Sequence, residues 1–167
     1  MTIRGKTWKY GDDVNTDQIF PGRYTYILMQ EEQMAEHALE DLDDDFAKNA
    51  QSGDIIVAGK NWGCGSAREQ AVKAIKTKGI SAIIAKSFAR IYFRNSLNEG
   101  LPVIVCPQAV DVLEKGAEVS IDFSNNTIKT EKGDFIFGKY PEYIQNMVDK
   151  GGLIPFVKEQ LKNAKSK

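Results

Sequence analysis

Three short apolar runs dominate the hydrophobic pattern of the first two-thirds of the chain, at residues 54–58, 80–85 and 102–106. Between them lie two segments with helical periodicity, at residues 67–78 and 88–98. Continuous apolar runs of this length are typical of strands that are buried on both faces. Because strands and helices alternate, the pattern predicts an α/β fold with parallel pairing of the three strands.

The segments on either side of this unit have a different character. On the N-terminal side, we predict an edge strand at 3–9, a turn-rich loop without regular structure at 11–23 and a helix at 31–42. On the C-terminal side, alternating residues predict antiparallel strands at 119–123, 127–130 and 134–137, then a helix over 141–148 and a last amphipathic helix with a basic tail. The sequence therefore favours one α/β domain, residues 1–167, with an antiparallel β layer added.

The composition narrows the functional class. The 22 basic and 23 acidic residues nearly balance, so we expect no nucleic acid partner. No stretch approaches the roughly 20 apolar residues of a membrane span, and the N-terminus lacks the apolar core of a signal peptide. We therefore expect no membrane partner. With two cysteines, Cys64 and Cys106, the chain has no disulfide framework, so we expect a cytoplasmic protein.

Histidine and cysteine are scarce enough to argue against several catalytic classes. A Ser-His-Asp hydrolase would need His37, the one histidine, whose helical pattern places it at a surface margin. Widely separated cysteines and a single histidine give no self-contained zinc or iron–sulfur site. The acidic run 41–45 lacks calcium-loop spacing and predicts a solvated helix end. We therefore expect no metal bound by this chain.

The loop at residues 59–70 carries the strongest candidate chemistry. It follows an apolar run, contains glycines at 59, 63 and 65, and places Ser66 just before the predicted helix, with Arg68 two residues on. Free N–H groups and the dipole at a helix start favour negative charge, which suits a reactive hydroxyl or a bound carboxylate. Residues 66–69 also read as a capping box, which alone would be structural. The glycines and the arginine favour a ligand site, but the loop has no nucleotide-binding spacing.

Three motifs occur in order across residues 10–105. They are Gly11-Asp12-Asp13-Val14-Asn15-Thr16-Asp17-Gln18-Ile19 with Pro21-Gly22-Arg23-Tyr24, then Gly63-Cys64-Gly65-Ser66-Ala67-Arg68-Glu69, then Ala85-Lys86-Ser87-Phe88-Ala89-Arg90-Ile91 with Arg94-Asn95. Together they resemble the small subunits of 3-isopropylmalate dehydratase, whose fold also forms the mobile C-terminal domain of aconitase. The resemblance implies a three-layer β/β/α swivel-type domain.

The resemblance also implies an activity and a partner. Proteins of this family are subunits of a hydro-lyase that interconverts 2-isopropylmalate and 3-isopropylmalate by dehydration and rehydration in leucine biosynthesis. The implied partner is a large subunit whose [4Fe–4S] cluster acts as a Lewis acid on a small hydroxy-dicarboxylate, so this chain should be inactive alone. Related hydro-lyases acting on homocitrate, 2,3-dimethylmalate or citramalate stay open, as does a non-catalytic carboxylate-binding module.

Carried over residue by residue, the resemblance assigns Ser66 as the catalytic serine, which as an alkoxide removes a proton beside a carboxylate. Arg68 matches an arginine that binds a substrate carboxylate, although it could also be a surface charge. Gly63, Cys64 and Gly65 form the rest of the active-site loop, where Cys64 would line the site as a small loop residue. Ala67 stands where the family often has a second serine, so its backbone N–H would bind the carboxylate instead.

The N-terminal motif supplies the remaining expectations. Thr16 and Asp17 match a pair that orients groups near the serine, with a simple Asx turn as the alternative. Arg23 is expected to be a second cation for the substrate, whereas Arg90 and Arg94 would position the fold or contact the large subunit. The apolar segment that follows Arg23 predicts a specificity loop for a branched alkyl group, made of Tyr24, Thr25, Tyr26, Ile27 and Leu28.

Overall fold

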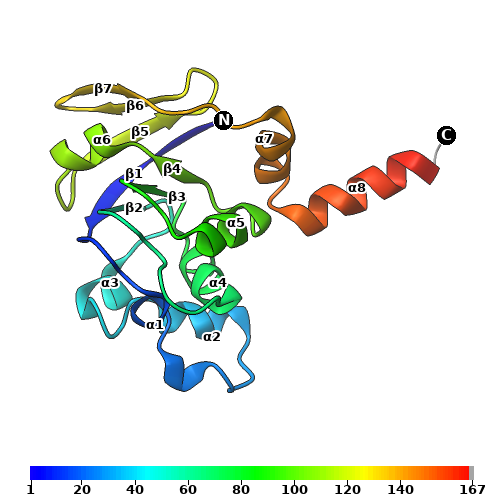
Figure 1. Ribbon diagram of the computed structural model, residues 1–167, viewed down its shortest axis with the longest axis horizontal. Helices are drawn as coiled ribbons and strands as arrows, with labels where there is room; N and C mark the ends of the chain where they lie inside the picture. The colour runs from blue at the N-terminus through cyan, green and yellow to red at the C-terminus, as the bar shows by residue number, and fades with distance from the viewer. Residues whose placement is uncertain (166–167) are drawn as a thin grey trace.

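The computed structural model describes residues 1–165, which form a seven-stranded mixed sheet in the order β4-β3-β2-β1-β5-β6-β7 (Figure 1). The strands are β1 (Thr2–Lys9), β2 (Ile55–Ala58), β3 (Ala82–Ala85), β4 (Val103–Val105), β5 (Glu118–Asp122), β6 (Thr127–Thr130) and β7 (Gly133–Ile136). The predicted α/β fold with a partly parallel sheet is confirmed.

Strands β1 to β4 form the parallel half of the sheet. Ile56 of β2 pairs with Trp8 of β1 on one side and with Ile83 of β3 on the other. Every residue of β2 and β3 is buried. Burial on both faces is the reason these strands appear in the sequence as continuous apolar runs rather than alternating ones.

The antiparallel half begins at β1, which pairs with β5, and continues through β6 to β7. Its strands alternate between buried and more exposed positions, as in β5, because one face stays closer to solvent. The prediction of β1 as an edge strand was wrong, since β1 lies in the middle of the sheet. Its second partner, β5, lies more than a hundred residues away in sequence, and no local pattern announces that pairing.

Eight α-helices and one 3-10 helix complete the described residues. They are α1 (Thr16–Ile19), the 3-10 helix Gly22–Tyr24, α2 (Glu31–Glu36), α3 (Asp44–Asn49), α4 (Glu69–Thr77), α5 (Arg90–Asn98), α6 (Pro107–Val112), α7 (Glu142–Asp149) and α8 (Leu153–Lys165). Figure 1 shows α4 and α5 together beside the parallel strands, and α8 extending away from the body. Within the described residues, every helix is too short or too polar to cross a lipid bilayer.

The helices differ from the predictions in the N-terminal third. The loop 11–23 contains α1 and a 3-10 turn, and the helix predicted over 31–42 ends at Glu36. It stops because Leu39 adopts a left-handed backbone conformation, and its N–H donates to the distant Ile19 carbonyl. The acidic run is a helix start: Asp43 caps α3 by accepting from the Asp45 and Phe46 N–H groups. The short helix α6 was not predicted.

Candidate functional site

Three loops meet at the carboxyl ends of adjacent parallel strands. One follows β1 and contains α1, one follows β2 and contains residues 59–68, and one follows β3 and leads into α5. Because β2 lies between β1 and β3, its loop is flanked by the other two. The crevice beyond the carboxyl ends of parallel strands is the usual place for a ligand in open α/β sheets.

Backbone hydrogen bonds hold the loop 59–66 on both sides. Towards the β1 loop, Gly63 N–H donates to the Val14 carbonyl and Thr16 N–H to the Cys64 carbonyl, each at 2.8 Å. Towards the β3 loop, Trp62 N–H donates to the Ser87 carbonyl at 3.1 Å. The loop is therefore fixed in place by its neighbours before any ligand arrives, which lowers the entropic cost of binding.

Gly63 is required by the close packing of this loop. Its φ of 78° is in the left-handed region, and a Cβ at this position would lie 2.2 Å from Cγ of Tyr92. Tyr92 is itself buried at 2 % exposure, and its ring packs edge-on against Trp62. Burial raises the pKa of the Tyr92 hydroxyl, so it stays protonated. A side chain at 63 would displace either the loop or this aromatic pair.

Ser66 is exposed and lines a cavity of about 350 Å³. Within the described residues its hydroxyl has no hydrogen-bond partner, while its carbonyl accepts from the Thr16 hydroxyl at 2.8 Å. The cavity is lined by Thr16, Asn61, Gly63, Gly65, Ser66, Ala67, Arg68, Ala89, Arg90, Ile91, Tyr92 and Asn95, which come from all three loops. Six of the sequence-predicted site residues thus lie together, with the hydroxyl of Ser66 free to meet a ligand.

Arg68 lines the same cavity and is held from behind. Its Nη1 lies 2.8 Å from Oδ1 of Asp17 and donates to the Phe20 carbonyl at 3.4 Å. Gly22 packs against this pair, because a Cβ there would lie 2.5 Å from Asp17 Oδ1. The Arg68 side chain is 16 % exposed, so little of the guanidinium can reach a ligand except on its cavity side. Asp17 therefore orients Arg68 and does not line the cavity.

The other N-terminal candidates lie outside the cavity. Arg23 is paired with Glu40 and Asp41 and stacks over the Tyr24 ring. This pairing holds the Asp41 pKa below its usual range. The predicted specificity loop, Tyr24, Thr25, Tyr26, Ile27 and Leu28, contributes no side chain to the cavity, and Tyr26 and Leu28 are almost fully exposed. The roles of Arg23 and of this loop in binding stay predictions.

The helix start next to Ser66 differs from the capping box considered above. Helix α4 begins at Glu69 with Arg68 as its N-cap residue, and Glu69 pairs with Lys73, which lowers the Glu69 pKa.

Cys64 was expected to line the site, but it is absent from the cavity lining. Its Sγ donates to the Asp13 carbonyl at 3.4 Å.

Six residues line the cavity that the sequence did not assign to the site: Asn61, Ala89, Arg90, Ile91, Tyr92 and Asn95. Four of them lie on α5, in or beside the third motif. Arg90 and Asn95 belong to that motif, so the sequence did contain a signal for them. Helical periodicity alone, however, does not tell which face of α5 meets the Ser66 loop. His37, by contrast, stacks on Tyr24 and pairs with Glu40, away from the cavity.

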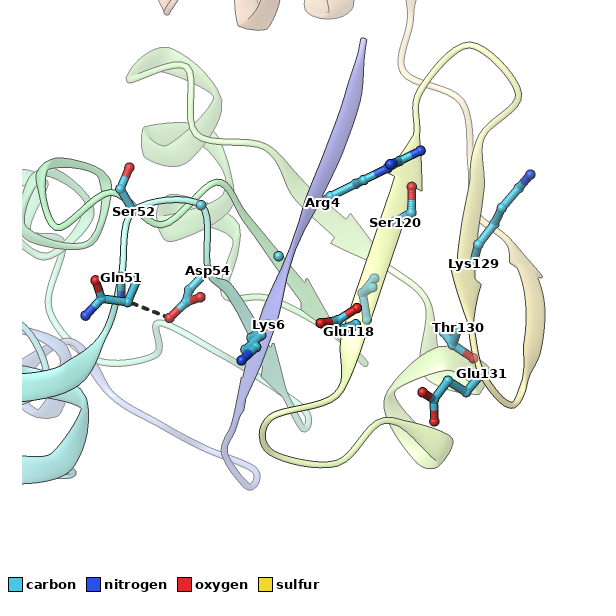
Figure 2. A pocket seen from close by; sticks show the side chains of 13 residues that line it. Arg4, Lys6, Gln51, Ser52, Asp54, Glu118, Ser120, Lys129, Thr130 and Glu131 are labelled. Carbon is cyan, nitrogen blue, oxygen red and sulfur yellow. Dashed lines mark hydrogen bonds between the residues drawn. The ribbon is translucent and has the colours of Figure 1, made fainter.

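A larger cavity, of about 790 Å³, lies over β1, β5 and β6. Figure 2 shows its side chains, among them Arg4, Glu118 and Lys129, with basic and acidic groups interspersed. Its buried carboxylate, Asp54, is already engaged, since it accepts from the Gln51 N–H and from the Trp8 indole. We therefore place the candidate site at the smaller cavity, where the Ser66 hydroxyl has no hydrogen-bond partner among residues 1–165.

The described residues contain no group of three or more histidine, cysteine, aspartate or glutamate side chains placed to hold a metal ion. Cys106 is buried, and its Sγ lies 3.9 Å from the Ile136 carbonyl, whereas Cys64 faces the Asp13 carbonyl. The two thiols thus point to different partners and do not form a ligand set for a cluster.

The chain matches the family described as the aconitase C-terminal domain over residues 12–109, which include all three site loops. It is 51 % identical over 164 residues to the 3-isopropylmalate dehydratase small subunit of Caldicellulosiruptor bescii, covering 97 % of this chain and 98 % of that protein. It is 45 % identical over 159 residues to the 2,3-dimethylmalate dehydratase small subunit of Eubacterium barkeri, covering 94 % and 97 %.

A solved structure shares the whole fold. The crystal structure of 3-isopropylmalate dehydratase from Methanocaldococcus jannaschii superposes with a TM-score of 0.92 at 39 % identity, and covers 100 % of both chains. The expected fold class is therefore confirmed.

Proposed function

This chain belongs to the aconitase C-terminal domain family and, within it, to the small subunits of 3-isopropylmalate dehydratase, and we propose that its Ser66 cavity is the half of the active site that this subunit contributes. The enzyme is a hydro-lyase, which interconverts 2-isopropylmalate and 3-isopropylmalate by removing and adding water. The observation that carries the site assignment is the exposed Ser66 hydroxyl, which shares a cavity with Arg68 and has no hydrogen-bond partner in the described part of the chain.

Ser66 is the proposed proton acceptor. Removing a proton beside a carboxylate requires a strong base, and a serine hydroxyl becomes one only where its negative charge is stabilised. The arginine in the same cavity favours that charge, and a partner closing over the cavity would exclude water and strengthen the attraction. Thr16 fixes the loop by donating to the Ser66 carbonyl, so the hydroxyl is presented from a rigid backbone.

Arg68 is the proposed ligand of a substrate carboxylate. A planar guanidinium can bind a carboxylate with two parallel hydrogen bonds. Asp17 restricts its rotation, so the fork is oriented before the substrate binds. Ala67 lines the cavity without a hydroxyl, which leaves its backbone N–H as the group that can donate to the same carboxylate.

The iron–sulfur cluster belongs, in this proposal, to the large subunit. The cysteines of this chain do not fit a cluster, because they face separate carbonyl groups. A small subunit implies a large-subunit partner, and a [4Fe–4S] cluster on that partner would supply the Lewis acid for the substrate hydroxyl. The exposed apolar side chains of Tyr26, Ile27 and Leu28 support an assembly of this kind, since they lie in the N-terminal loop without cover in this chain. We propose the cytoplasm as the site of action.

A second candidate substrate is 2,3-dimethylmalate, which the similarity to the Eubacterium barkeri subunit favours. Both substrates are dicarboxylates with alkyl substituents, so they demand the same catalytic groups and differ in the apolar contacts. The segment of residues 24–28 has no basic side chain, and thus favours an alkyl group over a third carboxylate.

The test is the variant Ser66→Ala in the enzyme reconstituted with its large subunit. Loss of a general base lowers turnover by about 10²- to 10⁴-fold. We therefore expect kcat for 3-isopropylmalate to fall within this range while complex formation persists. Ser124→Ala, an exposed serine in the β5–β6 turn, is the matched control and should keep full activity. Turnover of Ser66→Ala near that of the control would favour a binding module without catalysis. Assays with 2,3-dimethylmalate and citramalate compare the candidate substrates.

A further inference from the structure

The lining of the Ser66 cavity has an uneven charge. It contains two arginines, Arg68 and Arg90, and no acidic side chain. The following inference rests on the proposed function, because it concerns how this cavity holds a dicarboxylate. Two negative charges on a ligand are matched by two cations, provided that neither cation is already neutralised.

Arg68 supplies only part of this charge. Its guanidinium lies 2.8 Å from the Asp17 carboxylate, so the two together are close to neutral. One substrate carboxylate can share this guanidinium on its cavity side, but a second would meet a cation that already has an anionic neighbour. A further positive group is needed for the other end of the substrate.

Arg23, the second cation expected from the sequence, is badly placed for this role. It does not line the cavity, and it pairs with both Glu40 and Asp41. Recruiting it would break two ion pairs and its stacking on the Tyr24 ring. The two acidic partners already exceed its single charge, so it offers no net attraction to a dianion.

Arg90 meets the requirement. It is exposed, it lines the cavity, and within the described residues it has no ion-pair partner. It lies at the first position of α5, next to the β3 loop whose backbone is bonded to the Ser66 loop at Trp62. Asn95, on the same helix, also lines the cavity and can donate from its amide. The geometry points to Arg90 as the ligand of the second substrate carboxylate, with Arg68 holding the first.

The experiment compares Arg90→Ala with Arg94→Ala in the reconstituted enzyme. Arg94 lies one turn further along the same helix, is exposed and is absent from the cavity lining, so it controls for the loss of a positive charge on α5 outside the cavity. Charge-assisted hydrogen bonds of this type correspond to a change of about 10- to 100-fold in binding. We expect Arg90→Ala to raise KM for 3-isopropylmalate by this factor with a smaller change in kcat, Arg90→Lys to restore part of it, and Arg94→Ala to match the wild type.

Two inhibitors make the readout specific for the second charge. 2-Isopropylsuccinate carries two carboxylates, whereas 4-methylpentanoate carries one. Arg90→Ala should weaken inhibition by the dicarboxylate about 10- to 100-fold and leave inhibition by the monocarboxylate unchanged. A purely structural role would weaken both equally, and that result would overturn the inference, as would identical behaviour of the Arg90 and Arg94 variants.

Two further measurements separate the possible failures. If Arg90→Ala no longer binds the large subunit in gel filtration, Arg90 is an interface residue and the inference is overturned. If the wild-type enzyme does not turn over isopropylmalate, the proposed function fails instead, and calorimetric binding of 2-isopropylsuccinate to the wild-type and variant complexes still decides whether Arg90 holds a second carboxylate.

Discussion

Replacing Gly63 by alanine tests whether close packing holds the Ser66 loop. The new methyl group would start 2.2 Å from Cγ of Tyr92 and 2.4 Å from its Cβ, both near the rigid stem of the side chain. Rotation of the ring cannot relieve such a contact, so the backbone of the loop or of α5 must move. The backbone at Gly63 also has a φ of 78°, which an L-residue adopts unfavourably.

The two costs can be estimated separately. A left-handed conformation costs an L-residue about 1–2 kcal/mol. Overpacking a well-filled region costs about 1–3 kcal/mol more. We therefore expect Gly63→Ala to lower the free energy of unfolding by about 2–5 kcal/mol. Because the loop must shift to accommodate the methyl group, the Ser66 hydroxyl should move as well, and activity of the reconstituted enzyme should fall beyond what reduced stability explains.

Urea denaturation, followed by the fluorescence of Trp62 and Trp8, measures the change in unfolding free energy. Gly11→Ala is the matched control, since Gly11 has no neighbour within 4 Å of the added Cβ and no positive φ. Surface substitutions of this kind stay within about 0.5 kcal/mol of the wild type. If Gly63→Ala were as stable as Gly11→Ala and fully active, packing against Tyr92 would not be what fixes the Ser66 loop.

Two further predictions concern stability. Tyr140→Phe removes a buried hydroxyl that donates to the Val103 carbonyl at 2.6 Å and accepts from the Val103 N–H at 2.9 Å. The unfolding free energy should therefore fall by about 1–3 kcal/mol, whereas Tyr143→Phe, at an exposed position, should have little effect. Equal stabilities of the two variants in urea would contradict this. Arg23→Ala should make stability fall less steeply in acid. In the folded protein Arg23 lowers the Asp41 pKa, so the pair stabilises the fold above the unfolded pKa of about 4. This contribution is lost as the pH falls through the lower pKa of the folded state. Denaturation from pH 7 to pH 3 measures it, and parallel curves for wild type and variant would rule out the pairing in solution.

The sequence alone predicted the parallel unit and the Ser66 loop because their signals are local. Buried strands appear as uninterrupted apolar runs, and β2 and β3 are indeed buried at every residue. Glycines that permit close approach, followed by Ser66 and Arg68, indicate a ligand loop without reference to the rest of the chain. The same motif order was sufficient to identify the family.

Other features depend on contacts between distant segments, and only the tertiary structure decided them. Strand β1 became central through pairing with β5, and the helix beginning at Glu31 ended early because Leu39 bonds to Ile19. The proposed choice between arginines has the same origin. Arg23 and Arg90 have equal intrinsic charge, but the fold places two carboxylates beside Arg23, whereas Arg90 lines the cavity without an ion-pair partner among the described residues. A side chain's charge is encoded locally, whereas the partners that neutralise it are brought together only when the chain folds.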